Sequence, residues 1–178
     1  MALTETVRMV GGLMELAART APKAAGQDFI EARVLDDDER IALGDDMIAL
    51  AQERSSPNWT RDGQNVLDSS AVVLISLMPH PGAGLDCGAC GFPGCKEFNE
   101  RTVDNDFNGP NCALRLLDLG IALGSAAKVA SELNVDNRIM YRIGVSARRL
   151  GLTKANVCHG IPLSATGKNI FFDRVVRK

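Results

Sequence analysis

Hydrophobic and polar residues follow two patterns along the chain, one with the period of a helix and one with the period of a strand. Over residues 3–19, apolar side chains recur every three or four positions and predict an amphipathic helix. This helix should end near Pro22, because the residue before a proline avoids the α conformation. Apolar and charged side chains alternate across residues 29–35 and predict a strand. The run Ala71–Met78 is apolar almost throughout and rich in β-branched residues, so we expect a central strand covered on both faces.

The remaining elements follow from the same criteria. Four acidic residues at positions 36–39 favour the start of a helix that runs to about Arg54, and residues 55–58 predict a loop. Two further helices and two further short strands are expected over residues 113–133, 136–150, 156–163 and 169–173. This order predicts one α+β domain over residues 1–178, with residues 84–113 inserted between its halves.

Composition and charge narrow the class of protein. The chain has 178 residues, a net charge of −2 and 46% apolar residues, with no basic block, so we expect no nucleic-acid and no membrane-surface partner. Four charged residues interrupt the apolar helix at residues 113–133, which excludes a membrane span. No charged leader followed by an apolar stretch opens the sequence, so we expect the protein to stay in the cytoplasm.

Four of the five cysteines fall in one run, Cys87-x2-Cys90-x4-Cys95-x16-Cys112. The glycines between them allow tight turns, and Pro93 stiffens the segment. In a reducing cytoplasm such thiols stay free for metals. Backbone N–H groups turned inward would suit the sulfur atoms of an iron–sulfur cluster. The spacing therefore predicts a [4Fe-4S] cluster held by these four cysteines.

Two other interpretations of the cysteines remain open. Structural zinc also takes four thiolates, although its usual form is two paired knuckles, whereas Cys95 and Cys112 stand alone. Disulfides are the third alternative. The fifth cysteine, Cys158, lies in an apolar strand, where a cysteine is more often a small buried hydrophobe than a reactive thiol.

The segment Cys-Gly-x-Cys-Gly-Phe-Pro-Gly-Cys, with a fourth cysteine further on, resembles a short motif of known iron–sulfur proteins. It is similar to the motif of the corrinoid iron–sulfur protein and of the B subunit of the Rnf-type electron-transport complex. In those proteins the four cysteines bind one [4Fe-4S] cluster. Over its full length, the chain is similar to an uncharacterised family of ferredoxin-domain proteins from anaerobic bacteria and archaea.

A second resemblance concerns the rest of the chain. Residues 15–27 and the Leu-Gly-Leu at residues 150–152 resemble flavin nitroreductases, in which an early helix ends in an Ala-Pro turn. This likeness implies flavin mononucleotide (FMN) at a homodimer interface, with Lys23 and Gln27 near it and Lys168 at its phosphate. The Arg-Ser-x-Arg segment that grips the phosphate in that family has no counterpart here.

The same likeness places a dimer seam on the helix at residues 113–133. Gly120, Gly124 and Ala127 form a strip of small residues there, which suits close approach of a second helix.

These observations predict one-electron transfer to or from a redox partner protein. With a bound flavin, the protein would be an oxidoreductase that couples one-electron to two-electron chemistry. Without a flavin, it would be an electron carrier or a partner subunit, and with zinc it would be an interaction module.

Overall fold

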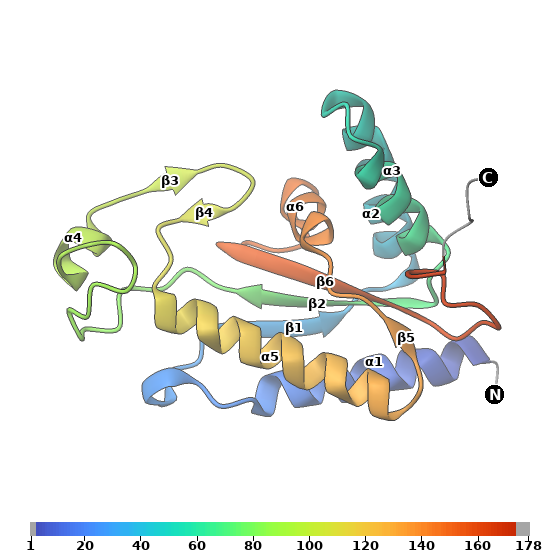
Figure 1. Cartoon of the computed structure of the whole chain (residues 1–178), viewed down its shortest axis with the longest axis horizontal. Coiled ribbons are helices and arrows are strands. Elements are labelled where there is room, and N and C mark those ends of the chain that lie inside the picture. Colours follow the sequence, from blue (N-terminus) through green and yellow to red (C-terminus); the bar gives the residue numbers. More distant parts are fainter. Residues whose placement is uncertain (1–2, 174–178) are drawn as a thin grey trace.

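In the computed structural model, which describes residues 3–173, a four-stranded antiparallel sheet lies between two layers of helices (Figure 1). In spatial order its strands are β1 (Ile30–Val34), β2 (Ala71–Leu77), β6 (Val157–Ser164) and β5 (Asp136–Asn137). The helices are α1 (Leu3–Thr20), α2 (Asp37–Glu53), α3 (Pro57–Leu67), α4 (Cys95–Asn99), α5 (Ala113–Glu132) and α6 (Tyr141–Arg149). A 3-10 turn, η1 (Ala24–Gly26), follows α1, and β3 (Val103–Asp104) pairs with β4 (Asn108–Gly109) in a separate hairpin. The predicted α+β class is confirmed.

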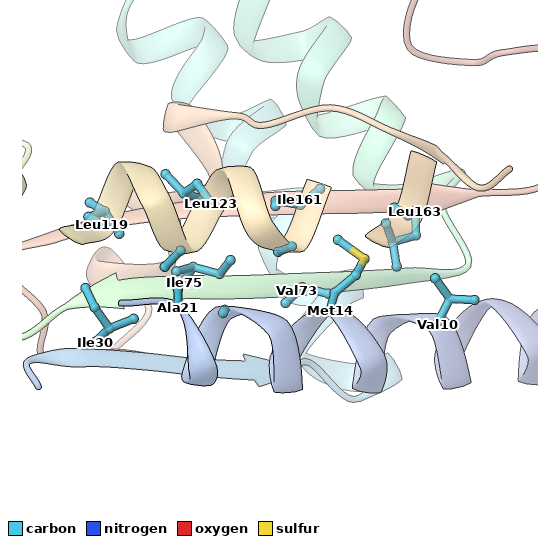
Figure 2. Close-up of a cluster of buried hydrophobic side chains, with 14 of the residues drawn as sticks. Val10, Met14, Ala21, Ile30, Val73, Ile75, Leu119, Leu123, Ile161 and Leu163 are labelled. Atoms are coloured by element: carbon cyan, nitrogen blue, oxygen red, sulfur yellow. The ribbon is translucent and has the colours of Figure 1, made fainter. Parts of the chain in front are cut away.

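Helices α1 and α5 pack side by side against one face of the sheet (Figure 2). Their buried side chains recur with helical spacing, as Val10 and Met14 do on α1 and Leu119 and Leu123 on α5. Burial of one such side chain stabilises a fold by about 1.5–3 kcal/mol. No helix in the described part of the chain has both the length and the apolar character needed to cross a bilayer.

Helices α2, α3 and α6 cover the opposite face, where they form a second buried cluster with the sheet. Helix α6 lies directly on β6, because each contributes a glycine at the contact. A Cβ atom on Gly144 would lie 1.6 Å from the carbonyl oxygen of Cys158, and one on Gly160 would lie 2.0 Å from Ile143 Cγ2. Strand β2 is thus covered on both faces and buried along its whole length, as its sequence predicts.

The acidic start of α2 forms as expected, with a specific hydrogen-bonding pattern. A carboxylate oxygen of Asp36 accepts the N–H of Glu39 at 2.8 Å, and Glu39 accepts the N–H of Asp36 at 3.1 Å. This reciprocal capping box satisfies two donors that the first helical turn otherwise leaves without partners.

Three elements differ from the sequence-based expectation. The predicted loop at residues 55–58 runs into α3, in which Pro57 occupies the first turn, where its missing N–H costs nothing. The strand predicted at residues 169–173 is a turn, because the Asn169 side chain accepts the N–H groups of Phe171 and Phe172. The helix predicted from residue 136 starts at Tyr141, because residues 136–137 pair with the edge of β6.

Residues 78–112 connect β2 to α5 and carry the cysteine segment. None of them joins the four-stranded sheet. Helix α4 and the β3–β4 hairpin lie together beyond one end of the sheet (Figure 1). The predicted insertion at residues 84–113 overlaps this connection and ends at the first residue of α5, and its status as an inserted segment stays a prediction.

The contact between α6 and β6 generates a stability prediction. Gly144→Ala should lower the free energy of unfolding by about 1–3 kcal/mol or more, because the new methyl group overlaps the β6 backbone. Gly12→Ala on α1 is the control. Its Cβ would have no neighbour within 4 Å, so it should be neutral or stabilise slightly. Urea denaturation followed by circular dichroism measures both, and equal stabilities would contradict the close packing.

Candidate metal centre

The segment with the first three cysteines folds back on itself in a tight turn. Asp86, Gly88 and Gly91 have φ angles of 46°, 70° and 85°. Glycine adopts such angles without the steric cost that other residues incur. The N–H of Gly91 donates to the carbonyl of Gly88 at 2.9 Å. The carboxylate of Asp86 accepts the N–H of Cys95 at 2.7 Å, which draws the two ends of the segment together.

All four cysteines of the motif line one pocket, although Cys112 comes from the start of α5. Phe92 and Phe98 also line this pocket and meet edge to face, with ring centroids 5.8 Å apart. All four thiols are free; one is exposed, two are partly exposed and Cys112 is buried. Within residues 3–173, no three Cys, His, Asp or Glu side chains are close enough to share one metal ion.

His80 fixes the backbone of Cys112. Its Nδ1 lies 2.8 Å from the carbonyl oxygen of Met78, and its Nε2 accepts the N–H of Cys112 at 3.1 Å. An accepting Nε2 assigns the ring proton to Nδ1. Burial lowers the pKa of His80, with a smaller contribution from the positive charge of Arg115, so the ring is neutral near pH 7. The imidazole also packs between Phe29 and Phe98.

A buried arginine ties α5 to the turn that follows α1. Arg115 is only 1% exposed and donates to the carbonyls of Ala24 (2.8 Å) and Gln27 (3.3 Å) and to the carboxylate of Asp118 (3.2 Å). Asp118 in turn accepts the N–H of Ala24 at 2.8 Å. The guanidinium lies over the Phe29 ring, 4.9 Å from its centroid. Breaking such a buried pair leaves an uncompensated charge and is strongly destabilising.

The resemblance to flavin nitroreductases places three residues of this chain near FMN. In the structure, two of them hydrogen-bond to other residues, and the third lies far from those two. Lys23 donates to the backbone carbonyl of Arg19 at the end of α1, and the side-chain oxygen of Gln27 accepts from Arg115. Gln27 lies just before β1, whose first residue, Ile30, pairs with Leu77 of β2, and the first residue of β6, Val157, pairs with the same Leu77. Strand β6 therefore begins at the end of the sheet near Gln27 and runs away from it. Lys168 follows β6 and so lies at the opposite end. Seven-residue β2 separates the two ends by about 20 Å.

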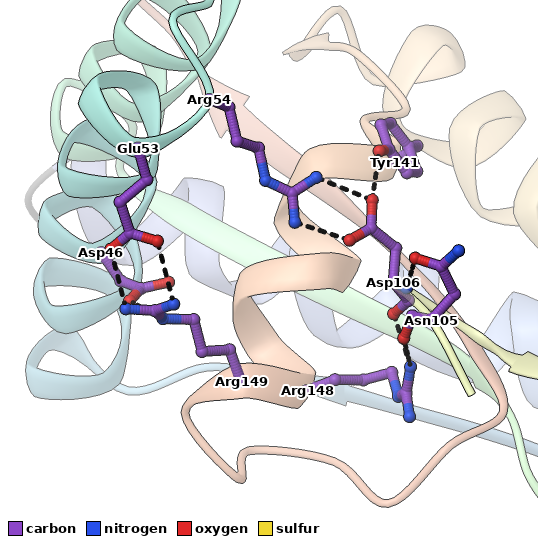
Figure 3. Close-up of polar contacts among 8 residues, drawn as sticks. All are labelled: Asp46, Glu53, Arg54, Asn105, Asp106, Tyr141, Arg148 and Arg149. Carbon is purple, nitrogen blue, oxygen red and sulfur yellow. Dashed lines mark hydrogen bonds and ion pairs between the residues drawn. The ribbon is translucent and has the colours of Figure 1, made fainter.

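A polar network fastens the β3–β4 hairpin to the body of the protein (Figure 3). Arg54 donates two hydrogen bonds to Asp106, at 2.8 and 2.6 Å, and Tyr141 donates a third at 2.9 Å. Arg148 also donates to the carbonyl of Asp106. The hydrogen bond from Arg54 lowers the pKa of Asp106, so the pair stays ionised near neutral pH. The hairpin leads directly to Cys112, and this network therefore limits how far Cys112 can move.

Cys158 is separate from this centre. It is fully buried on β6, and its sulfur accepts the hydroxyl hydrogen of Ser76 at 3.2 Å. Burial raises the pKa of Cys158 to about 11. It is therefore a neutral thiol at physiological pH, which agrees with its interpretation as a small buried hydrophobe.

No sequence motif points to His80 or Asp106, because their partners lie far along the chain. Arg115 and Asp118 do carry a signal. They stand three positions apart in an otherwise apolar helical stretch, and charges on a buried face need partners.

Comparison with known proteins identifies relatives by sequence. Residues 108–174 match the family described as "Uncharacterized protein containing a ferredoxin domain (DUF2148)". That match includes Cys112 but not the other three cysteines of the motif. An uncharacterised protein of Archaeoglobus fulgidus is 45% identical over 176 residues, which cover 98% of this chain and 95% of the relative.

The fold resembles solved structures at low sequence identity. Nitroreductase A from Vibrio parahaemolyticus has a TM-score of 0.56 and 13% identity, covering 90% of this chain and 59% of that protein. The FMN-dependent nitroreductase NfnB from Mycobacterium smegmatis, solved with NADPH, has a TM-score of 0.57 and 10% identity, covering 96% and 84%. A BluB-like flavoprotein from Clostridium difficile has a TM-score of 0.55, 16% identity and the same coverage. The chain thus spans about three fifths of the Vibrio enzyme, and these likenesses establish the nitroreductase-like fold alone.

The contrast between the buried and the exposed thiols can be measured directly. In folded, metal-free protein at pH 8, Cys87 should react quickly with iodoacetamide, because its side chain is exposed. Cys158 should remain unmodified, because with a pKa of about 11 only about one molecule in a thousand is a thiolate. Mass spectrometry of the digested protein locates the label. Modification of Cys158 at the rate of Cys87 would contradict its burial.

Proposed function

Since this chain belongs to the family of uncharacterised proteins that contain a ferredoxin domain, we propose that it transfers electrons through a [4Fe-4S] cluster bound by Cys87, Cys90, Cys95 and Cys112. The observation that carries this proposal is the common pocket lined by the four cysteines. They come from two separate segments of the chain, and sequence-local folding alone would not bring them together.

The donor set fits such a cluster. Iron–sulfur clusters take cysteine thiolates as their usual ligands, and four are available here. Phe92 and Phe98 add apolar surface to the pocket, while the exposed Cys87 gives a partner protein access to the site. When bound, the cluster supplies a centre that accepts and releases one electron. The role of the protein is to hold the thiolates, tune the potential and present the centre to a redox partner protein.

A single zinc ion is the alternative for the same four cysteines, because structural zinc also takes four thiolates. Its usual sequence form is two paired knuckles, whereas Cys95 and Cys112 stand alone in the sequence. The spacing of the cysteines therefore favours the cluster over zinc. Free thiols also suit a reducing compartment, which supports a cytoplasmic location.

The ligand set is tested by five single substitutions. Cys87, Cys90, Cys95 and Cys112, each changed to Ser, should reduce iron and sulfide content in anaerobically purified protein. Cys158→Ser is the matched control and should keep the full content, because this thiol lies outside the pocket. Full iron in Cys112→Ser would remove that residue from the ligand set. Zinc without sulfide in the unsubstituted protein would support the interaction module instead.

A flavin-linked oxidoreductase is the second candidate, and the fold likeness to an FMN-dependent nitroreductase favours it. A bound flavin would allow two-electron chemistry on a substrate. Lys23, Gln27 and Lys168 do not fit a flavin phosphate within one chain, because Lys23 and Gln27 have partners and Lys168 follows the opposite end of β6. A flavin held by these three residues would need Lys168 from a second copy.

We further propose that the protein forms a homodimer through the outer face of α5. Every exposed position from Ala113 to Ala127 is apolar or glycine: Leu116, Leu117, Gly120, Ile121 and Gly124. The two charged residues in this stretch, Arg115 and Asp118, are buried. The neighbouring helix α1 adds further exposed apolar residues, among them Met9, Leu13 and Leu16. Exposed apolar area of this kind marks an interaction surface, and the likeness to nitroreductases supports a second copy as its occupant.

The dimer is tested by sedimentation velocity. Leu117, which is 61% exposed in one chain, should be buried in the dimer, so Leu117→Glu should shift the protein from dimer to monomer. Ile41→Glu is the control, because Ile41 is an exposed apolar residue on α2, away from the proposed surface. A monomeric unsubstituted protein, or equal behaviour of the two variants, would contradict this dimer.

A further inference from the structure

A second pocket, of about 520 Å³, lies beside the cysteine pocket and shares Phe98 with it. Its walls come from the exit of β2 at residues 79–81, from the end of α4 and the residues that follow it (residues 98–102), and from β4 with the residue before β6. Figure 1 shows these segments gathered at the end of the sheet that carries the hairpin. The volume falls in the range of small-molecule sites, about 300–1,000 Å³.

The apolar part of this pocket is formed by aromatic and proline rings. The rings of His80 and Phe98 line it with centroids 6.4 Å apart, and Pro79, Pro81 and Pro110 line it as well. Aromatic rings are planar, and proline rings, although puckered, have little conformational freedom to lose on binding. Such walls favour a planar ligand over a flexible chain.

The polar part offers both hydrogen-bond donors and acceptors. The Asn99 oxygen is taken by the N–H of Gly82 (2.8 Å), which leaves its amide hydrogens free to donate. The Asn156 side chain donates to Asn111 (3.3 Å), which leaves its oxygen free to accept. These groups match the edge of a heterocycle that has both donors and acceptors.

Arg101 gives the pocket its charge. It lines the pocket, and within the described residues its guanidinium has no hydrogen-bond or ion-pair partner. Other arginines around the hairpin are paired: Arg54 binds Asp106, and Arg148 binds Asn108. An unpaired guanidinium at the mouth of a pocket is suited to a carboxylate or phosphate, which it can bind with two hydrogen bonds.

We propose that this pocket binds a planar, hydrogen-bonding heterocycle with an acidic group, the chemistry of FMN, in place of a site at Lys23, Gln27 and Lys168. The binding itself depends only on the pocket, but its redox role rests on the proposed cluster. The two pockets are adjacent, since Phe98 lines both and His80, which lines this one, accepts the N–H of Cys112. A bound heterocycle would therefore lie beside the proposed cluster site.

The proposal is tested by titrating anaerobic, cluster-loaded protein with FMN and with riboflavin, following the quenching of flavin fluorescence. Both should bind saturably, because the ring contacts are shared. Arg101→Ala should weaken FMN binding about tenfold or more and leave riboflavin unchanged, since only FMN carries a phosphate. Asn156→Ala should weaken both ligands by removing an acceptor for the ring. Lys168→Ala and Lys96→Ala are matched controls that remove cations outside this pocket and should change neither affinity.

Absence of saturable FMN binding would overturn the proposal, as would FMN binding that is lost in Lys168→Ala but kept in Arg101→Ala. Iron and sulfide assays on the same samples separate this test from that of the proposed function. A protein that carries its cluster but binds no flavin contradicts only the pocket assignment. A protein that binds FMN in this pocket without iron contradicts only the cluster.

Discussion

The position of Cys112 is the constraint on which the proposed cluster site depends. Three of the four cysteines lie close together in the sequence, and a local turn can gather them. Cys112 lies further along the chain, so the overall fold must bring it close to the other three. The N–H of Cys112 donates to His80 at the exit of β2, and its carbonyl accepts the N–H of Leu116 in the first turn of α5. A buried N–H without a partner costs about 1–3 kcal/mol, so His80 holds this residue in one place.

Helix α5, which begins directly after Cys112, is itself anchored to the turn that follows α1. Arg115, one turn after Cys112, is buried and hydrogen-bonded to the turn after α1. Asp118 neutralises its charge. Because a displaced Arg115 would leave unpaired charge in the interior, the start of α5 cannot shift freely. The Asp106 network restrains the hairpin that precedes Cys112, so this cysteine is fixed from both sides.

Features encoded locally could be predicted from the sequence, and features that depend on long-range pairing could not. The helix at residues 3–19, the buried strand at residues 71–78 and the spacing of the cysteines are local patterns, and the two elements form as expected. Helix α3 is not evident from the sequence because Ser-Pro is common in loops, whereas here Ser56 occupies the N-cap position and Pro57 begins the helix. The separation of Lys168 from Lys23 and Gln27 follows from strand register, which a single sequence does not display. The roles of His80 and Asp106 depend on partners 32 and 52 residues away, respectively.

The claim that these four cysteines hold an iron–sulfur cluster is tested most directly on the anaerobically purified protein itself. We expect about four irons and four sulfides per chain. After reduction with dithionite, we expect the low-temperature EPR signal of a paramagnetic [4Fe-4S]+ centre. A colourless protein that contains zinc and no sulfide, with no EPR signal after reduction, would contradict the account.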